Sequence, residues 1–507
     1  MSYPEISAHS GATRRIGASA LLSILAAFTF AAIGIFAWSA ATGPYAITTN
    51  DIIIGEAVLV FVVAFGPFVW RRLTGETVDF FEPGFVFAII YVIVFTVRPI
   101  FLLSPWVAWV DSVPAEINRY LQITPDSMAL AVFYGLLGII FFQLGYGGLH
   151  IRRSSRPAAP QDFQQPRRVW LSDRVRKLVV GGIVFASVSW LLVAPAIGNL
   201  SNVVGEFGRV RALLVGYGYQ GLGIDLLPVV ALFAWVDHLQ GRRRWIVWPL
   251  VIFSNVYNIM LGSRAGVYSL WLYMFLAYRY MTGKSFSRKQ WIAGALLVAL
   301  IFVFAMSAGE LRNEEFHDWS SVRTSVEDFW TQEPLGRITA TFLLEFDQVD
   351  IFATVLTVGP RTFPFLWGES YAELLLQPIP RWIWPDKPWP YDVNIGWYAA
   401  QTQTAIPPSM VGELYMNFHI VGVTLGMFLF GALFRSAYRY LVTDSREPAK
   451  ILLYSLLLPY LPLLILRSFV GAGTTLAVLG IPAWLATRYV APMPKQKPMV
   501  ASAGRLP

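Results

Sequence analysis

The stretch DIIIGEAVLVFVVAFGPFVWRR, residues 51–72, decides what class of protein this chain belongs to. Its first 20 residues contain only two acidic side chains, and Arg71 and Arg72 follow at once. As a helix, 20 residues extend about 30 Å, which matches the hydrocarbon core of a bilayer. Because arginines after an apolar span are typical of its cytoplasmic end, the stretch predicts a transmembrane helix with a known direction.

Eleven further apolar stretches predict spans of the same kind. The chain has 507 residues, of which 56% are hydrophobic and 14% charged, and this composition excludes an ordinary soluble domain. We therefore expect an all-α polytopic membrane protein with about twelve transmembrane helices and both termini in the cytoplasm. Besides 51–70, the predicted spans are 16–42, 84–104, 127–149, 178–199, 222–238, 245–262, 265–281, 291–308, 412–434, 451–467 and 469–489.

The basic residues divide unevenly between the two sides that this topology defines. Of 39 lysines and arginines, 12 fall on the outward side, which leaves 39 − 12 = 27 on the cytoplasmic side. The positive net charge of +8 is therefore explained by orientation in a membrane, and we expect no nucleic-acid partner. The outward twelve are Arg98, Arg119, Arg209, Arg211, Arg264, Arg312, Arg323, Arg337, Arg361, Arg381, Lys387 and Arg467.

One large segment, residues 309–407, separates nine spans (1–308) from the last three (408–490) and the cytoplasmic tail (491–507). It holds 14 acidic and 6 basic residues, a net charge of −8. We expect a partly helical extracytoplasmic loop that covers the active site, with helices over 307–330 and 338–358. A thirteenth span over the second helix is the alternative. Its carboxylates at Glu345, Asp347 and Asp350 would cost several kcal/mol in lipid, so we expect that helix to pack against the bundle or lie at its mouth.

Arginine dominates the outward side, where Lys387 is the exception among the twelve. A guanidinium group binds phosphate oxygens through a planar fork of donors, so an outer cavity for a diphosphate would favour arginine. Two alternatives stay open: Arg264 as an interfacial residue that reaches to lipid headgroups, and Arg209 and Arg211 on a solvated loop. The candidates for diphosphate binding are Arg264, Arg312, Arg381, Arg209, Arg211 and Lys387.

Three residues are candidates for a catalytic base. Glu310 and His317 lie near Arg312 within about two helical turns, and a solvated helix with local ion pairs is the alternative there. Glu413 falls near the outer leaflet, where an unpaired carboxylate would be costly, so we expect it to have an arginine partner. The chain has no cysteine and no HExxH or DxD pattern, so we expect no metal site and no cofactor.

The segment PFLWGESYAELLLQPIPRWIWPDKPWPYD, residues 364–392, is the most unusual in the chain. Its prolines cannot continue a helix, and Trp382, Trp384 and Trp389 crowd around charged residues. Exposed tryptophans suit either sugar faces or the membrane interface. Composition alone does not choose between these two partners.

Two segments resemble a known family, the Wzy-type oligosaccharide repeat unit polymerases of O-antigen and exopolysaccharide. They are GESYAELLLQPIPRWIWPDKP (368–388) and PSMVGELYMNFHIVGV (408–423). His419 departs from the family pattern, in which glycine is usual at that place. The positions that match are Gly368, Ser370, Tyr371, Pro380, Arg381, Trp384, Pro385, Lys387, Pro388, Gly412, Glu413, Tyr415, Asn417 and Phe418, and the pair Ser263 and Arg264 also fits.

The resemblance implies a membrane-embedded, metal-independent glycosyltransferase of the C type in the bacterial cytoplasmic membrane, with the loop in the periplasm. Its expected donor and acceptor are undecaprenyl-diphosphate-linked oligosaccharides, and its other expected partners are membrane lipids and a chain-length regulator protein. The catalytic candidates then become Glu413, Glu310 and His317, and the sugar-binding candidates become Trp382, Trp384, Trp389, Tyr415 and Asn417. Two alternatives stay open: an O-antigen ligase, and a transporter or flippase of lipid-linked oligosaccharides.

Overall fold

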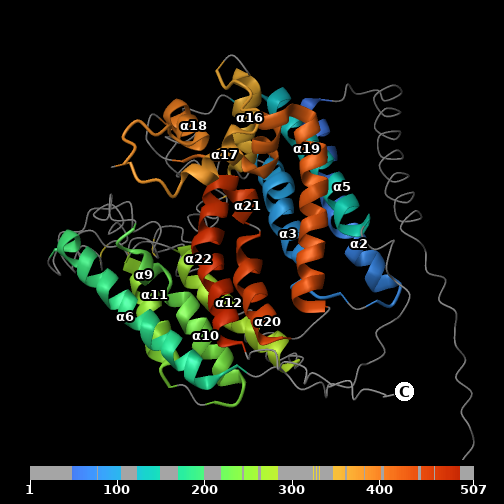
Figure 1. Ribbon diagram of the computed structural model, residues 1–507. Helices are drawn as coiled ribbons and strands as arrows, with labels where there is room; N and C mark the ends of the chain where they lie inside the picture. Colours follow the sequence, from blue (N-terminus) through green and yellow to red (C-terminus); the bar gives the residue numbers. More distant parts are fainter. Residues whose placement is uncertain are drawn as a thin grey trace, which may run out of the picture.

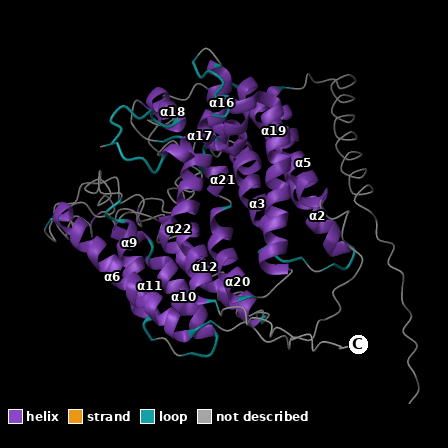
Figure 2. Cartoon of the chain, in the orientation of Figure 1, coloured by secondary structure: helices purple, strands orange, loops and turns teal. Residues whose placement is uncertain are grey.

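The chain is described by a computed structural model, in which helices dominate (Figure 2). It describes residues 48–76, 78–103, 123–148, 170–198, 219–242, 245–260, 264–283, 346–359, 362–381, 383–400, 405–443, 447–461 and 463–491, and the single residues Thr324, Glu327 and Thr331. Within these ranges no β-strand occurs. The predicted all-α class is therefore confirmed for this part of the chain.

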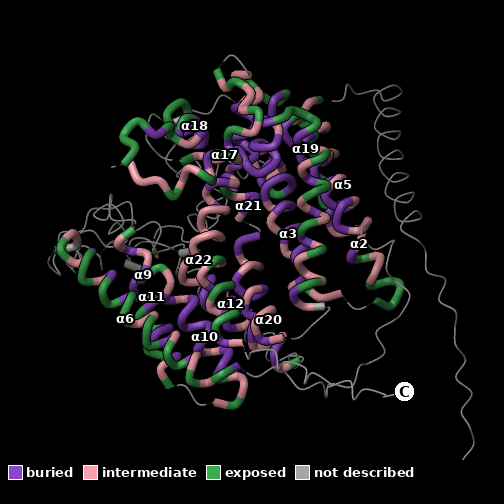
Figure 3. The backbone as a smooth tube through the Cα atoms, in the orientation of Figure 1, coloured by how far each residue is buried: buried purple, intermediate pink, exposed green. Residues whose placement is uncertain are grey.

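Eight helical stretches among the described residues are long and apolar enough to cross a bilayer. Many of their large apolar side chains are exposed, as expected where lipid replaces water, and Figure 3 shows exposed residues recurring along these helices. The molecule is accordingly a multi-pass membrane protein. The stretches are Thr49–Leu73, Pro83–Leu103, Pro125–Gly148, Ser172–Ala196, Leu222–Leu239, Ser409–Val442, Pro448–Leu466 and Phe469–Val490.

Each of these eight stretches coincides with a predicted span. Two other predicted spans are helices of different character: α11 (Val247–Met260) has only 14 residues, and α12 (Arg264–Thr282) carries several tyrosines and an arginine near each end. The predicted spans 16–42 and 291–308 lie outside the described residues. The total of twelve therefore stays a prediction.

Local sequence explains where several helices begin. Thr48 and Asp51 form a capping box at the start of α2 (Thr49–Leu73), and Ser468 caps α22 (Phe469–Val490) by accepting a hydrogen bond from the Gly471 amide. Proline occupies the first turn of α3 (Pro83–Val92) and of α20 (Pro448–Leu457), where its missing N–H costs nothing.

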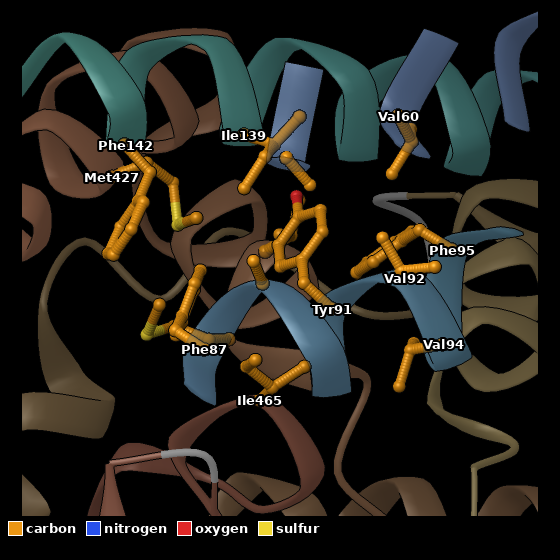
Figure 4. Close-up of a cluster of buried hydrophobic side chains, with 14 of the residues drawn as sticks. Val60, Phe87, Tyr91, Val92, Val94, Phe95, Ile139, Phe142, Met427 and Ile465 are labelled. Atoms are coloured by element: carbon orange, nitrogen blue, oxygen red, sulfur yellow. The ribbon is translucent and has the colours of Figure 1, made fainter. Parts of the chain in front are cut away.

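A first hydrophobic core lies between α2, α3, α5 (Pro125–Gly148) and α19 (Ser409–Tyr438). Figure 4 shows Phe87 and Tyr91 of α3 below Ile139 and Phe142 of α5. The Phe87 and Phe142 rings stack at 4.0 Å, and the Tyr91 hydroxyl donates to the Gly135 carbonyl at 2.6 Å. This packing joins helices that are far apart in the sequence.

A second core lies beside the first (Figure 1) and is formed by α6 (Ser172–Ile197), α10 (Leu227–Leu239), α11, α12, α20 and α22. Its polar contacts include a hydrogen bond of 2.7 Å between the hydroxyl groups of Tyr273 and Tyr460. Helices α12 and α20 also contribute Leu276 and Tyr454 to the first core, so they connect the two groups.

One end of the bundle, called here the basic end, gathers arginines from several helices. Glu82 accepts a hydrogen bond from Arg71 at 2.6 Å and lies 4.0 Å from Arg435. Asp79 accepts from the hydroxyl groups of Tyr280 at 2.6 Å and Tyr438 at 2.9 Å. The C-terminal ends of α2, α12 and α19 therefore meet at the N-terminal side of α3, as the alternation of helix directions requires.

The segment after residue 346 contributes three short helices at the opposite end (Figure 1): α16 (Gln348–Val358), α17 (Glu369–Leu376) and α18 (Tyr391–Ala400). The predicted helix over 338–358 is observed from Gln348, after a turn at Phe346 and Asp347. With 11 residues, α16 extends about 16 Å and is too short to cross a bilayer. It packs against α5 and α19.

A buried ion pair attaches α16 to the membrane helices. Arg98 donates to Asp350 from Nη2 at 2.6 Å and from Nε at 3.1 Å, and both side chains are buried. Arg98 was expected on the outward side of the membrane. In the structure it belongs to the helical stretch Pro83–Leu103, and its charge is neutralised by Asp350.

Candidate functional site

The candidate site lies where α17, α18 and the first turns of α19 and α22 meet, at what we call the acidic end of the bundle. Three buried carboxyl groups gather there, from Glu373 of α17, Asp392 of α18 and Glu413 of α19. Glu373 is electrostatically coupled to Asp392 and to Glu413. These residues come from segments up to 40 positions apart, so only the tertiary structure brings them together.

Glu413 is at the centre of a hydrogen-bond network. Its Oε1 atom accepts from the Ser370 hydroxyl at 2.7 Å, and its Oε2 atom accepts from the Phe469 amide at 2.6 Å. Phe469 is the first residue of α22, so the carboxylate also lies at the positive end of a helix dipole. The prediction that Glu413 has an arginine partner is therefore wrong for the described residues. The N-terminus of α22 and Ser370 contact its carboxyl group instead.

Asn417 completes the network between α17 and α19. Its Nδ2 atom donates to the Ser370 hydroxyl and to the Glu413 carbonyl, at 2.8 Å each, and its Oδ1 atom accepts from the Gly368 amide at 2.8 Å. Ser370 and Asn417 are fully buried. Residues of the segments 368–388 and 408–423 thus form one unit, which joins α17 to the membrane helix α19.

Asp392 and Glu373 are also held at helix starts. Asp392 accepts from the Ser468 hydroxyl at 2.6 Å, and the backbone amide of Tyr391, the first residue of α18, lies near Glu373 and acts to lower its pKa. Burial and the nearby Asp392 raise the pKa of Glu373 to about 8, and burial raises the pKa of Asp392 as well. Because Glu373 holds its proton at neutral pH, this pair can donate or accept a proton near physiological conditions.

Backbone strain is concentrated around the same network. Among the described residues other than glycine, positive φ angles occur at Trp367 (49°), Ser409 (68°) and His419 (54°). Each such conformation costs about 1–3 kcal/mol and persists only where the surroundings impose it. Trp367 precedes Gly368, Ser409 is the first residue of α19, and His419 follows soon after Asn417. Strain of this kind is typical of functional sites.

The strain at His419 accompanies a break in α19. Phe418 and His419 both depart from helical geometry, and the Met416 carbonyl accepts instead from the Leu366 amide at 2.9 Å. A Cβ atom on Gly422 would lie 2.1 Å from the Leu414 carbonyl oxygen, so the backbone approaches itself closely beyond the break. A positive φ explains why glycine suits position 419, where this chain has histidine.

Arg381 and Lys387 hold the tryptophan-rich loop in shape. Arg381 donates to the carbonyl groups of Lys387 and Pro388, and its guanidinium lies 3.8 Å from the centre of the Trp389 ring. The Lys387 ammonium donates to the carbonyl groups of Gln377 at 3.3 Å and Ile379 at 3.2 Å. Burial and the neighbouring Arg381 lower the pKa of Lys387. Both cations are thus engaged with their own loop.

The other predicted site residues divide into two groups. Trp384 and Trp389 are exposed, at 37% and 45%, and Tyr415 is half-buried with its ring 4.9 Å from that of Tyr134. Arg264 is the first residue of α12. Outside the described residues lie Glu310, His317, Arg312, Arg209, Arg211 and Trp382, whose assignments stay predictions.

Several residues of the site were not among the predicted ones. Asp392, Glu373 and Ser468 form its second half, and nothing in the local sequence marks the two acids, because their neighbours come from distant segments. Ser468 did carry a signal, since serine immediately before an apolar run is typical of an N-cap. No group of three metal-binding side chains occurs among the described residues.

Comparisons with protein-family models, with curated proteins and with solved structures find no match to this chain. The geometry of the acidic end therefore carries the functional argument. It offers buried carboxyl groups of raised pKa, exposed tryptophans and a strained backbone, all beside the ends of membrane helices.

Proposed function

We propose that this protein polymerises oligosaccharide repeat units linked to undecaprenyl diphosphate into a long bacterial surface polysaccharide, at the outer face of the cytoplasmic membrane. In this reaction the bond between the first sugar of the growing chain and its diphosphate breaks. A hydroxyl group at the non-reducing end of an incoming unit forms the new bond and loses its proton to a base. Undecaprenyl diphosphate is the leaving group.

The observation that carries the proposal is the hydrogen-bonded unit of Ser370, Glu413 and Asn417. These residues belong to the two segments that resemble the polymerases, and they meet although more than 40 residues separate Ser370 from Glu413. They lie beside exposed tryptophans, which suit sugar faces, and at the end of the bundle opposite the basic end (Figure 1). That placement supports an active site on the outer side.

The roles within the site follow from which groups are already occupied. Both carboxylate oxygens of Glu413 accept hydrogen bonds, so in this conformation Glu413 serves chiefly to position α17, α19 and α22. Glu373 and Asp392 each retain an oxygen with no hydrogen-bond partner. We assign Asp392 as a further candidate for the base, beside Glu310 and His317, and Glu373 as a group that can donate a proton, because it holds its proton at neutral pH. Diphosphate binding is assigned to Arg264, Arg312, Arg209 and Arg211, with Arg381 and Lys387 shaping the adjacent loop.

The test is polymerisation of purified lipid-linked units by the purified protein in detergent. The wild type should form a ladder of products, Arg264→Ala should form single units only, and Arg72→Ala should match the wild type. Arg72 is the control because it is an exposed arginine at the basic end. A product ladder excludes a transporter, which makes no bond. Transfer to a lipid A core sugar in place of repeat units would indicate a ligase.

A further inference from the structure

Four ring-bearing residues form a surface beside the network, called here the aromatic wall: Phe365, Trp367, Tyr415 and His419. The His419 ring lies 4.8 Å from that of Tyr415 and 5.7 Å from that of Phe365, and Phe365 lies 6.1 Å from Trp367. Tyr134 of α5 packs behind Tyr415 and His419, at 4.9 Å and 6.4 Å. Elements from three parts of the chain therefore build one surface.

The wall is accessible and carries polar groups that the protein itself does not use. Trp367 is 75% exposed, and His419 is exposed as well. Among the described residues, neither the imidazole of His419 nor the hydroxyl of Tyr415 has a hydrogen-bond partner. Flat rings with a few free polar groups are typical of sites that bind small polar ligands with apolar faces.

The orientation of the wall is maintained against backbone strain. Trp367 and His419 both have positive φ angles, and glycine at either position would remove the strain. Trp367 is fixed on both sides, because the Leu366 amide donates to the Met416 carbonyl at 2.9 Å and the Gly368 amide donates to Asn417 at 2.8 Å. A tryptophan that only anchors the protein to a membrane needs the right depth but no fixed ring plane.

The depth of the wall also argues for a ligand at the membrane surface. The stretch Ser409–Val442 has 34 residues, about 51 Å as a helix, which exceeds the hydrocarbon core by about 20 Å. The break at His419 divides off the first third of it. The part beyond the break is about 34 Å long and matches the core, so the wall lies near the boundary where a lipid-linked sugar would emerge.

We propose that the aromatic wall binds a sugar ring of the lipid-linked substrate, with Trp367 stacking on the ring face and His419 and Tyr415 hydrogen-bonding to its hydroxyl groups. This inference rests on the proposed function and deepens it, because it assigns the carbohydrate to one surface. It also gives the histidine at position 419 a role that glycine could not perform.

The test uses Trp367→Gly and His419→Gly in the purified protein. Each substitution removes a ring and relieves strain, so KM for lipid-linked units from cells lacking this protein should rise roughly 3- to 10-fold while the unfolding temperature stays the same or rises. Trp397→Ala is the control, because Trp397 is an exposed tryptophan of α18 with no ring contact to the wall. Its KM should equal that of the wild type.

A second measurement separates this inference from the proposed function. The same lipid-linked units should raise the unfolding temperature of the wild type, and less so that of Trp367→Gly. If the wild type binds the lipid-linked units without polymerising them, the proposed function fails. The difference in unfolding-temperature shift between wild type and Trp367→Gly still tests whether the aromatic wall binds the sugar. Unchanged KM and unchanged shift in both variants would overturn the inference, and so would a defect seen in bilayers but absent in detergent, which indicates lipid contact. Should Trp367→Gly misfold, Trp367→Phe replaces it. Its KM is then expected to lie above that of the wild type but to rise by less than the roughly 3- to 10-fold expected for Trp367→Gly.

Discussion

Acidic residues are buried at both ends of this molecule, but different groups hold them. At the basic end Glu82 lies between Arg71 and Arg435, and Asp79 lies between Arg279 and two tyrosine hydroxyl groups. At the acidic end Asp350 is also paired with an arginine, Arg98, but Glu413 and Asp392 accept from the amide at the start of α22 and from the hydroxyl groups of serines. The opposite charges at the basic end cancel, whereas the acidic end keeps carboxyl groups that can exchange protons.

This difference separates a structural cluster from a candidate functional one. An ion pair between arginine and carboxylate fixes neighbouring helices but leaves neither group available for chemistry. Carboxyl groups near helix N-termini are stabilised by dipoles, and a raised pKa allows them to act as acid or base near neutral pH. Glu373 fits the second description, and Glu82 fits the first.

The largest effect is expected from breaking the basic end. Glu82→Leu leaves Arg71 and Arg435 without their shared carboxylate, and we expect a loss of about 3 kcal/mol of stability. The control is Glu76→Gln, because Glu76 pairs with the same Arg71 at 3.4 Å but is 64% exposed. It should change stability by at most about 0.5 kcal/mol. Thermal unfolding in detergent measures both, and equal effects would contradict the structural role of Glu82.

A smaller effect is expected at the acidic end. In Glu413→Gln an amide replaces the carboxylate that accepts from Ser370 and Phe469, so the charge-assisted hydrogen bonds are lost at a cost of about 2 kcal/mol. Glu369→Gln is the control, since Glu369 is the first residue of the neighbouring α17 and is exposed. It should remain within about 0.5 kcal/mol of the wild type. A loss in Glu413→Gln as large as that in Glu82→Leu would remove the contrast between the two ends.

The smallest expected effect is on the pH dependence of stability, and it tests whether Glu373 at the acidic end exchanges a proton. The pKa of Glu373 is raised to about 8 in the folded protein, above its unfolded value of roughly 4.3. Its contribution to stability is therefore complete below the unfolded pKa and is lost as pH rises through about 8. Between pH 5 and pH 9, the unfolding temperature of Glu373→Gln should fall less than that of the wild type. Identical slopes in wild type and Glu373→Gln would refute the assignment.

Much of the fold could be predicted because it depends on local properties. Apolar length identifies the eight helical stretches that are long enough to cross a bilayer, and proline or serine before an apolar run marks several helix starts. The helix that contains α16 was expected to pack against the bundle or lie at its mouth because of its carboxylates, and α16 packs against α5 and α19. Its partner Arg98 was not anticipated, since 252 residues separate it from Asp350.

The candidate site was only partly predictable for the same reason. Glu413 and Asn417 were singled out as functional residues, but the partners that define their roles are Ser370 and the start of α22. Arg381 was expected to bind a diphosphate, and the structure engages it with two carbonyl groups and Trp389 of its own loop. Residue type indicates what a group can bind, and only its neighbours determine which bond it forms.

By itself, the sequence determined that this protein is a helical membrane protein, because the free energy of transferring a segment into lipid is a sum over its own residues. The tertiary structure decided which acids are neutralised and which are held at helix starts. Those outcomes depend on contacts between segments distant in the chain, where burial and geometry set the charge and the pKa of each group.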